Sequence, residues 1–204
     1  MNKTRRRFVY LASQSPRRAQ LLEQLGLPFE KLLPDASEDA ESLEAVVPGE
    51  SARKYVQRVT ALKLHAALGR LRQRGLPPAP VLCSDTTVTV GALILGKPAD
   101  RSDARRMLRL LSGRTHKVLT AVAVGNTRRV EMLVSESHVS FAPMSESQIR
   151  SYVASDEPMG KAGGYAVQGL AARHIREIRG SYTGIMGLPL FETAQLLKAF
   201  GLPT

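Results

Sequence analysis

The sequence predicts an α/β protein, because segments with strand and helix patterns alternate along its 204 residues. Short apolar or β-branched runs indicate strands at residues 8–12, 29–33 and 80–90. Apolar residues at helical spacing indicate a long helix over residues 48–75. With 43% hydrophobic residues, the chain can bury a substantial core, as one large domain or two small lobes.

The first strand leads directly into the start of a helix. Ser15 suits the N-cap, and Pro16 suits the first helical position, where no amide donor is needed. Arg17 and Arg18 therefore fall in the first turn, where the helix dipole disfavours cations. These guanidinium groups, free backbone N–H groups and the hydroxyls of Ser13 and Ser15 indicate a site for a polyanion. The alternative is an ordinary capped helix with two solvated arginines.

An acidic loop at residues 34–41 separates the second strand from the long helix. Its carboxylates could serve only solubility, or one of them could face the arginines through a metal ion. The long helix is predicted to bury a stripe made of Ala52, Tyr55, Val56, Val59, Leu62 and Ala66. Lys63 lies at the edge of this stripe, where a long side chain can reach solvent or a cleft.

The strand at residues 80–90 carries a carboxylate between two apolar stretches. Asp85 therefore lies in or at the end of a largely buried strand, where an unpaired carboxylate is costly and a partner, a cation or a metal ion is expected. A structural Asp that caps a turn is the alternative. Asp85, Thr86 and Thr87 put three polar groups in a core strand, which favours a functional role.

Residues 91–98 approach the phosphate-loop pattern G-x-x-x-x-G-K-[ST]. Pro98 stands where the Ser or Thr belongs, and the residues between the two glycines are apolar and strand-like, so we reject a P-loop. Lys97 remains of interest as a cation between a glycine and a rigid proline.

The second half of the chain predicts a basic helix, a hairpin and two further helices. They are a helix at 102–111, strands at 115–124 and 129–141, a helix at 145–154 opened by a capping box, and a closing helix at 189–200. Two loops, at 156–169 and 181–187, contain the glycines that let backbone approach a ligand.

The net charge of +11 raises the question of nucleic-acid binding. The basic residues are spread out, aromatic residues make up only 5% of the chain, and no tryptophan offers a stacking surface, so we expect no nucleic-acid partner. No apolar run could span a bilayer, and we expect no membrane association.

Cys83 is the single cysteine and is interpreted as a small buried hydrophobe, which favours a cytoplasmic location. The four histidines lie on separate predicted elements and are interpreted as structural or solvated.

Taken together, these stretches resemble the Maf (septum-formation-inhibitor-like) nucleotide pyrophosphatases. The matching pieces are Leu11-Ala12-Ser13 through Arg18, Ser84-Asp85-Thr86, Leu95-Gly96-Lys97-Pro98, Leu111-Ser112-Gly113 with His116, Lys161-Ala162-Gly163, Gln168-Gly169 and Gly187-Leu188-Pro189. They follow the family order and span nearly the whole chain. The resemblance implies a single domain over residues 1–204 with an elongated mixed sheet flanked by helices, two lobes and a central cleft, similar to inosine triphosphatase.

The resemblance also implies hydrolysis of a nucleoside triphosphate to the monophosphate and pyrophosphate with Mg²⁺ or Mn²⁺, commonly by a homodimer. Asp85 matches the family's proton acceptor and, with Glu38, the metal region. The positions that match the phosphate-binding region are Ser13, Arg18, Lys63 and Lys97. A nucleotide-sensing regulator of cell division that uses the same cleft is the alternative of a different class.

Three further positions bear on the choice of base. A branch of the family that acts on dTTP and UTP carries Arg, Thr and Gln where this chain has Arg17, Thr86 and Gln168. A second branch, similar to enzymes acting on 7-methylguanosine triphosphate, carries Trp, Gln and Glu there. An amide such as Gln168 can pair with both the carbonyl and the N–H of a uracil or thymine ring. One departure is Gly160, which replaces the family's Asp before Lys-Ala-Gly and predicts slower turnover or weaker metal binding.

Overall fold

The computed structural model describes residues 7–35, 38 and 42–203. Its strands are β1 (Val9–Leu11), β2 (Phe29–Lys31), β3 (Val81–Val90), β4 (Leu93–Leu95), β5 (Thr115–Gly125), β6 (Val130–Phe141) and β7 (Ile175–Arg179). Its helices are α1 (Pro16–Glu23), α2 (Ala52–Gln73), α3 (Arg101–Leu111), α4 (Glu146–Ala154), α5 (Tyr182–Met186) and α6 (Leu190–Ala199), with 3-10 turns η1 (Ser42–Glu44), η2 (Ala162–Gly164) and η3 (Leu170–His174). Most of the predicted acidic loop, residues 36–37 and 39–41, lies outside the described residues.

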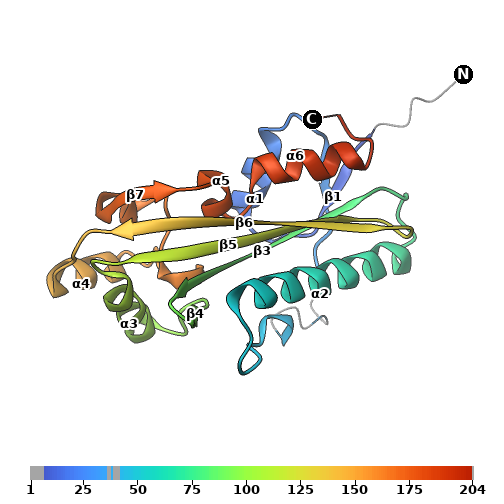
Figure 1. The fold of residues 1–204 in the computed structure, drawn as a ribbon. Helices are drawn as coiled ribbons and strands as arrows, with labels where there is room; N and C mark the ends of the chain where they lie inside the picture. The colour runs from blue at the N-terminus through green and yellow to red at the C-terminus, as the bar shows by residue number, and fades with distance from the viewer. Residues whose placement is uncertain (1–6, 36–37, 39–41, 204) are drawn as a thin grey trace, which may run out of the picture.

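The strands form one seven-stranded mixed sheet in the order β2-β1-β3-β5-β6-β7, with β4 paired to β3. β1 runs parallel to β2 and β3, whereas the other pairs are antiparallel. The long strands β3, β5 and β6 give the sheet its elongated shape, with α2 along one face, α6 on the other and α3 and α4 at the far end (Figure 1). The predicted α/β class with a mixed sheet flanked by helices is therefore confirmed.

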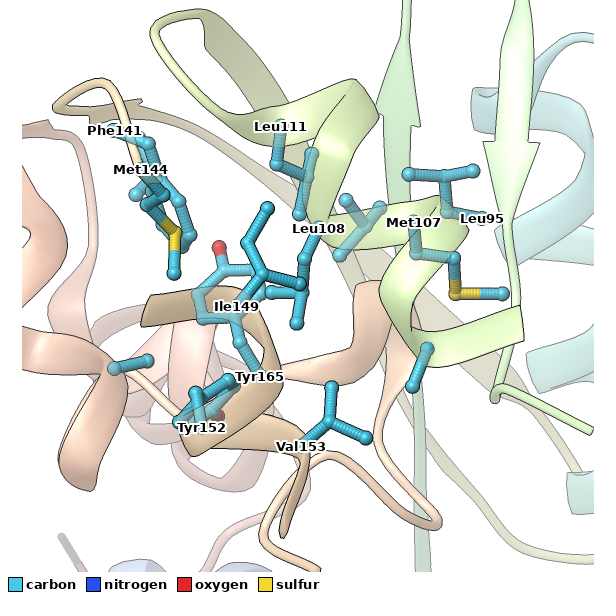
Figure 2. Packing of buried hydrophobic residues seen from close by; sticks show 14 of the residues in the cluster. Leu95, Met107, Leu108, Leu111, Phe141, Met144, Ile149, Tyr152, Val153 and Tyr165 are labelled. Atoms are coloured by element: carbon cyan, nitrogen blue, oxygen red, sulfur yellow. The ribbon is translucent and has the colours of Figure 1, made fainter. Parts of the chain in front are cut away.

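The buried apolar side chains form several clusters along this sheet. At one end, Met107 and Leu108 of α3, Tyr152 of α4 and the rings of Phe141 and Tyr165 pack together (Figure 2). At the other end, one cluster joins β1 to α1 and α6, and another joins β1 and β3 to α2. Hydrophobic burial is the main favourable term in folding. A fourth cluster packs Tyr55, Val56 and Val59 of α2 on Leu119 and Ala121 in the middle of β5.

Helix α2 differs from its predicted course in two details. It begins at Ala52 instead of Pro48, because the Ser51 side chain caps it by accepting from the Lys54 amide. The predicted buried residue Leu62 is 39% exposed, and the helix buries Leu64 and Ala67 instead. The expectation for Leu62 was therefore wrong, whereas Tyr55, Val56 and Val59 are buried as predicted.

Two elements near the C-terminus were not predicted. The basic stretch before residue 180 forms β7, an edge strand that pairs with β6. The predicted loop at 181–187 contains the short helix α5, which Ser181 caps by accepting from the Gly184 amide. Other expectations are confirmed: β5 and β6 form a hairpin, a capping box opens α4, and Cys83 is buried. Within the described part of the chain, no helix is long and apolar enough to cross a membrane.

Candidate active site

A cavity of about 630 Å³ opens beside the middle of β3. Its position follows from the sheet register, since β1 pairs with β3 only at Val81 and Leu82 and β4 pairs only from Val88 onward. Within the described structure, this edge of β3 has no strand neighbour over residues 83–87. Side chains from both faces of β3 can therefore reach one opening. All the predicted site residues line this cavity: Ser13, Arg17, Arg18, Glu38, Lys63, Asp85, Thr86, Lys97 and Gln168.

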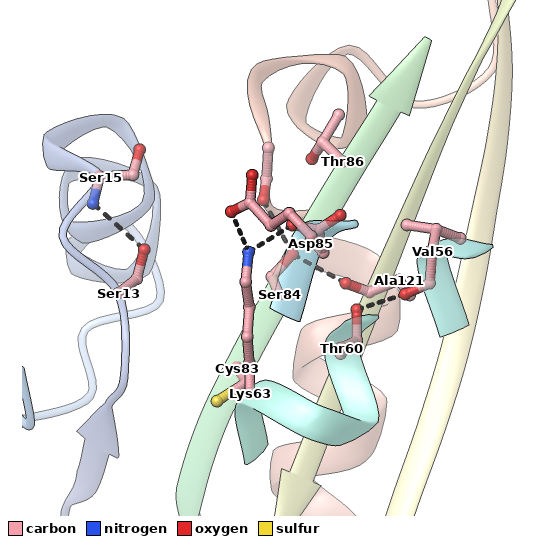
Figure 3. Close-up of polar contacts among 12 residues, drawn as sticks. Ser13, Ser15, Val56, Thr60, Lys63, Cys83, Ser84, Asp85, Thr86 and Ala121 are labelled. Carbon is pink, nitrogen blue, oxygen red and sulfur yellow. Dashed lines mark hydrogen bonds and ion pairs between the residues drawn. The ribbon is translucent and has the colours of Figure 1, made fainter. Parts of the chain in front are cut away.

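Asp85 lies at the centre of the cavity wall and is 6% exposed. The Lys63 ammonium, which reaches in from α2, donates to Asp85 Oδ1 at 2.6 Å and to Glu44 Oε1 at 2.7 Å (Figure 3). Lys97, which follows β4, lies 2.9 Å from Glu44 Oε2. We call Glu44, Lys63, Asp85 and Lys97 the charged cluster. It provides the partner that a carboxylate inside a core strand requires.

Glu44 belongs to the cluster although the sequence did not single it out. Burial opposes its ionisation most strongly, but the charges and hydrogen bonds of Lys63 and Lys97 outweigh burial and lower the Glu44 pKa. Glu44 is therefore an anion held between two cations. The only sequence signal was its place just after the acidic loop, where several carboxylates stand close together and spacing does not distinguish them.

Glu38 lines the same cavity but contacts a different partner. Arg70 of α2 donates from Nε to Glu38 Oε1 at 2.8 Å and from Nη2 to Oε2 at 2.5 Å. The Arg70 hydrogen bond is the main reason why the pKa of Glu38 falls to about 2. Such bidentate pairs are geometrically specific. Both Glu38 oxygens are thus held by Arg70, whereas Glu44 is the glutamate that contacts Lys63.

Arg18 extends from α1 into the cavity and is held at three points. Its Nε donates to the Gly187 carbonyl at 2.7 Å, Nη1 to Ser13 Oγ at 3.4 Å and Nη2 to Thr86 Oγ1 at 3.4 Å. Gly187 has φ +121, a backbone conformation that glycine adopts readily and other residues rarely do, so a side chain here would strain the segment that holds Arg18. Burial lowers the Arg18 pKa. The guanidinium remains charged, because arginine is not deprotonated in proteins.

The start of α1 differs from expectation in one contact. Ser15 occupies the N-cap position, but its side chain makes no capping hydrogen bond. Its backbone N–H donates to Ser13 Oγ at 3.2 Å instead. Arg17 lines the cavity in the same turn, and burial lowers its pKa. Anionic groups are favoured at this end of a helix.

The glycine-rich loop forms the far wall of the cavity. Lys161 donates to the carbonyls of Glu157 and Met159, and its pKa is lowered, first by burial and then by the charge of Arg17. Gly160 has φ +70, and no atom lies within 4 Å of a Cβ built there. A side chain at this position would therefore have space but a strained backbone.

Residues 8–200 match the sequence pattern of the family described as "Maf-like protein". This chain belongs to the Maf family. It is 64% identical to the "dTTP/UTP pyrophosphatase" of Albidiferax ferrireducens, over 95% of this chain and 97% of that protein. It is 65% identical to the protein of the same name from Polaromonas sp., over 96% of each chain.

A solved structure, "The structure of the Staphylococcus aureus Ham1 protein", aligns with a TM-score of 0.48 at 13% identity, over 95% of this chain and 97% of that one.

Proposed function

We propose that this protein hydrolyses dTTP and UTP to the nucleoside monophosphate and pyrophosphate. The charged cluster supports this activity most directly, because it puts a buried carboxylate and two lysines together at one cavity. The high identity to Maf proteins named dTTP/UTP pyrophosphatase supports the substrate choice. Residues 1–204 act as one catalytic domain, which we place in the cytoplasm as a homodimer.

The donor set fits a divalent cation, Mg²⁺ or Mn²⁺. Mg²⁺ is usually bound through one or two carboxylates together with substrate phosphates. Asp85 and Glu44 contact the same Lys63 ammonium, so two carboxylates converge at one point. No group of three or more His, Cys, Asp or Glu suited to a metal lies in the described part of the chain. When bound, the cation supplies positive charge that neutralises the phosphates.

Asp85 acts as the general base. Its carboxylate accepts the proton of the water that attacks the α-phosphorus, and the α–β bond breaks to release pyrophosphate. Lys63 holds Asp85 by its Oδ1 and fixes the carboxylate in place. Position and charge are the main contributions that a protein makes to such phosphoryl chemistry.

The cations at the cavity receive the triphosphate. Lys63 and Lys97 exchange contacts with Glu44 for contacts with phosphate oxygens, and Arg18 presents its fork of N–H donors beside Ser13. Arg17, Thr86 and Gln168 set the choice of base.

The decisive experiment is a panel of nucleoside triphosphates with Mg²⁺ or Mn²⁺, scored separately for pyrophosphate and orthophosphate. We expect pyrophosphate from dTTP and UTP, at rates well above that from 7-methylguanosine triphosphate. Orthophosphate as the first product would overturn the proposed bond cleavage. Tight binding of dTTP without turnover would instead support a nucleotide-sensing regulator.

A further inference from the structure

We propose that Thr120 is a positioning residue that orients the phosphate-binding Arg18 through the hydroxyl of Thr86. Thr120 lies on β5, directly opposite Thr86 on β3, and is 1% exposed. Its Oγ1 is 3.0 Å from Thr86 Oγ1 and 2.7 Å from the Gly184 carbonyl of α5. This proposal rests on the proposed function insofar as Arg18 binds phosphate.

The direction of each hydrogen bond follows from donor counting. A carbonyl only accepts, so the single hydroxyl hydrogen of Thr120 goes to the Gly184 oxygen. Thr120 must therefore accept in its contact with Thr86, and Thr86 must donate there. Arginine has no acceptor, so Arg18 Nη2 donates to a lone pair of Thr86. The three contacts form one ordered chain from Arg18 to α5.

Without Thr120, the hydrogen of the Thr86 hydroxyl loses its acceptor and must turn to another one. The direction of the Thr86 lone pair that accepts from Arg18 Nη2 is then no longer fixed. The remaining anchors of Arg18 are the Gly187 carbonyl and the more distant Ser13 hydroxyl. The guanidinium would then lose part of the orientation that two-point phosphate recognition needs.

The same series of hydrogen bonds determines whether Thr86 can donate or accept a hydrogen bond to a ligand. Its only hydrogen is committed to Thr120, so toward the cavity it presents a lone pair and acts as an acceptor. Thr120 thereby fixes the hydrogen-bonding character of a residue assigned to substrate choice, although Thr120 itself is buried behind it.

The test uses Thr120→Val, which keeps the shape and removes the hydroxyl, and Thr120→Ser, which restores it. The ligand-free readout is the Arg18 Nε–H signal in ¹⁵N NMR spectra, assigned with Arg18→Lys. We expect Thr120→Val to broaden or shift this signal and to speed its exchange with water, and Thr120→Ser to restore it. The affinity for inorganic pyrophosphate, measured by calorimetry, is expected to fall about tenfold in Thr120→Val, as for the loss of one net hydrogen bond.

Thr193→Val is the matched control, because Thr193 of α6 is also fully buried and donates to a backbone carbonyl, that of the N-cap residue Pro189. It should lower the melting temperature without moving the Arg18 signal. If Thr120→Val does not fold, Thr120→Cys retains a weak donor of similar size and should show a smaller change of the same kind.

A double substitution tests whether Thr86 and Thr120 act together. In a Thr86→Val background, Thr120→Val should have no further effect on the Arg18 signal, because the series of hydrogen bonds is already broken. An unchanged Arg18 signal in folded Thr120→Val, or independent effects of the two substitutions, would overturn the proposal. Failure of the wild-type protein to turn over dTTP would instead refute the proposed function, since the Arg18 signal needs no substrate.

Discussion

The stability of the protein should depend on pH through one buried histidine. His116 of β5 is 1% exposed, and its Nε2 lies 2.8 Å from the Tyr165 hydroxyl. Its Nδ1 is buried without a hydrogen-bond partner in the described structure. Burial lowers the His116 pKa from 6.5 to about 4, so the folded protein holds the ring neutral.

The lowered pKa determines how the stability changes with pH. Above pH 6.5 the ring is neutral in both states, and His116 has no effect on the pH dependence. As the pH falls below 6.5, the unfolded chain binds a proton that the folded chain excludes, so stability decreases until about pH 4. At about 1.36 kcal/mol per pKa unit, the full loss is about 3 kcal/mol, with about 2.5 kcal/mol of it by pH 4.5.

The assay is urea unfolding at pH 7.5, 6.5, 5.5 and 4.5. His116→Gln can keep a hydrogen bond to Tyr165 but does not titrate, so most of this loss between pH 6.5 and 4.5 should disappear. His174, whose pKa is also lowered, first by burial and then by Arg173, retains a contribution of the same sign in the variant.

His138→Gln serves as the control, because the His138 side chain is 42% exposed on β6. Wild type and this control should lose stability in parallel over the same interval. Equal pH dependence in wild type and His116→Gln would refute the reasoning, because it would show that the buried ring does not exclude the proton. The carboxylates with lowered pKa, such as Glu38 and Glu44, affect stability mainly below this window.

Four further predictions concern the cavity. Asp85→Asn should lower kcat for dTTP by roughly a hundredfold or more, and near-normal turnover would remove it as the base. Glu44→Gln should weaken Mn²⁺ binding measured by calorimetry. Glu38→Gln should mainly lower the free energy of unfolding, because it removes the ion pair with Arg70. The reverse result would show that Glu38, and not Glu44, binds the metal. Gly160→Asp should lose about 1 kcal/mol of stability through its φ of +70. It should also bind Mn²⁺ more tightly than Gly160→Asn, and equal affinities would show that position 160 does not contribute to metal binding. Gln168→Glu should raise KM for dTTP and UTP more than it weakens pyrophosphate binding, and parallel losses would exclude a role in base choice.

Features that depend on neighbouring residues could be predicted from the amino-acid sequence. The β-branched run around Asp85 placed a carboxylate inside a core strand, and that is where β3 holds it. Ser15 and Pro16 marked the start of α1, and the Ser145 capping box marked α4. These signals are local, since a cap or a strand run is decided by residues a few positions away. The resemblance to the Maf family, carried by short motifs in order, is likewise confirmed.

Which side chains contact one another in the cavity could be seen only in the folded protein. Glu38 and Glu44 are both glutamates in or beside an acidic stretch, yet in the fold one pairs with Arg70 and the other with Lys63. The unpaired edge of β3 arises because β1 ends early and β4 begins late, which no single strand pattern reveals. The opposition of Thr86 and Thr120 depends on the register of β3 with β5. Register is set by the packing of the whole sheet, so residues far apart in sequence acquire joint roles only after folding.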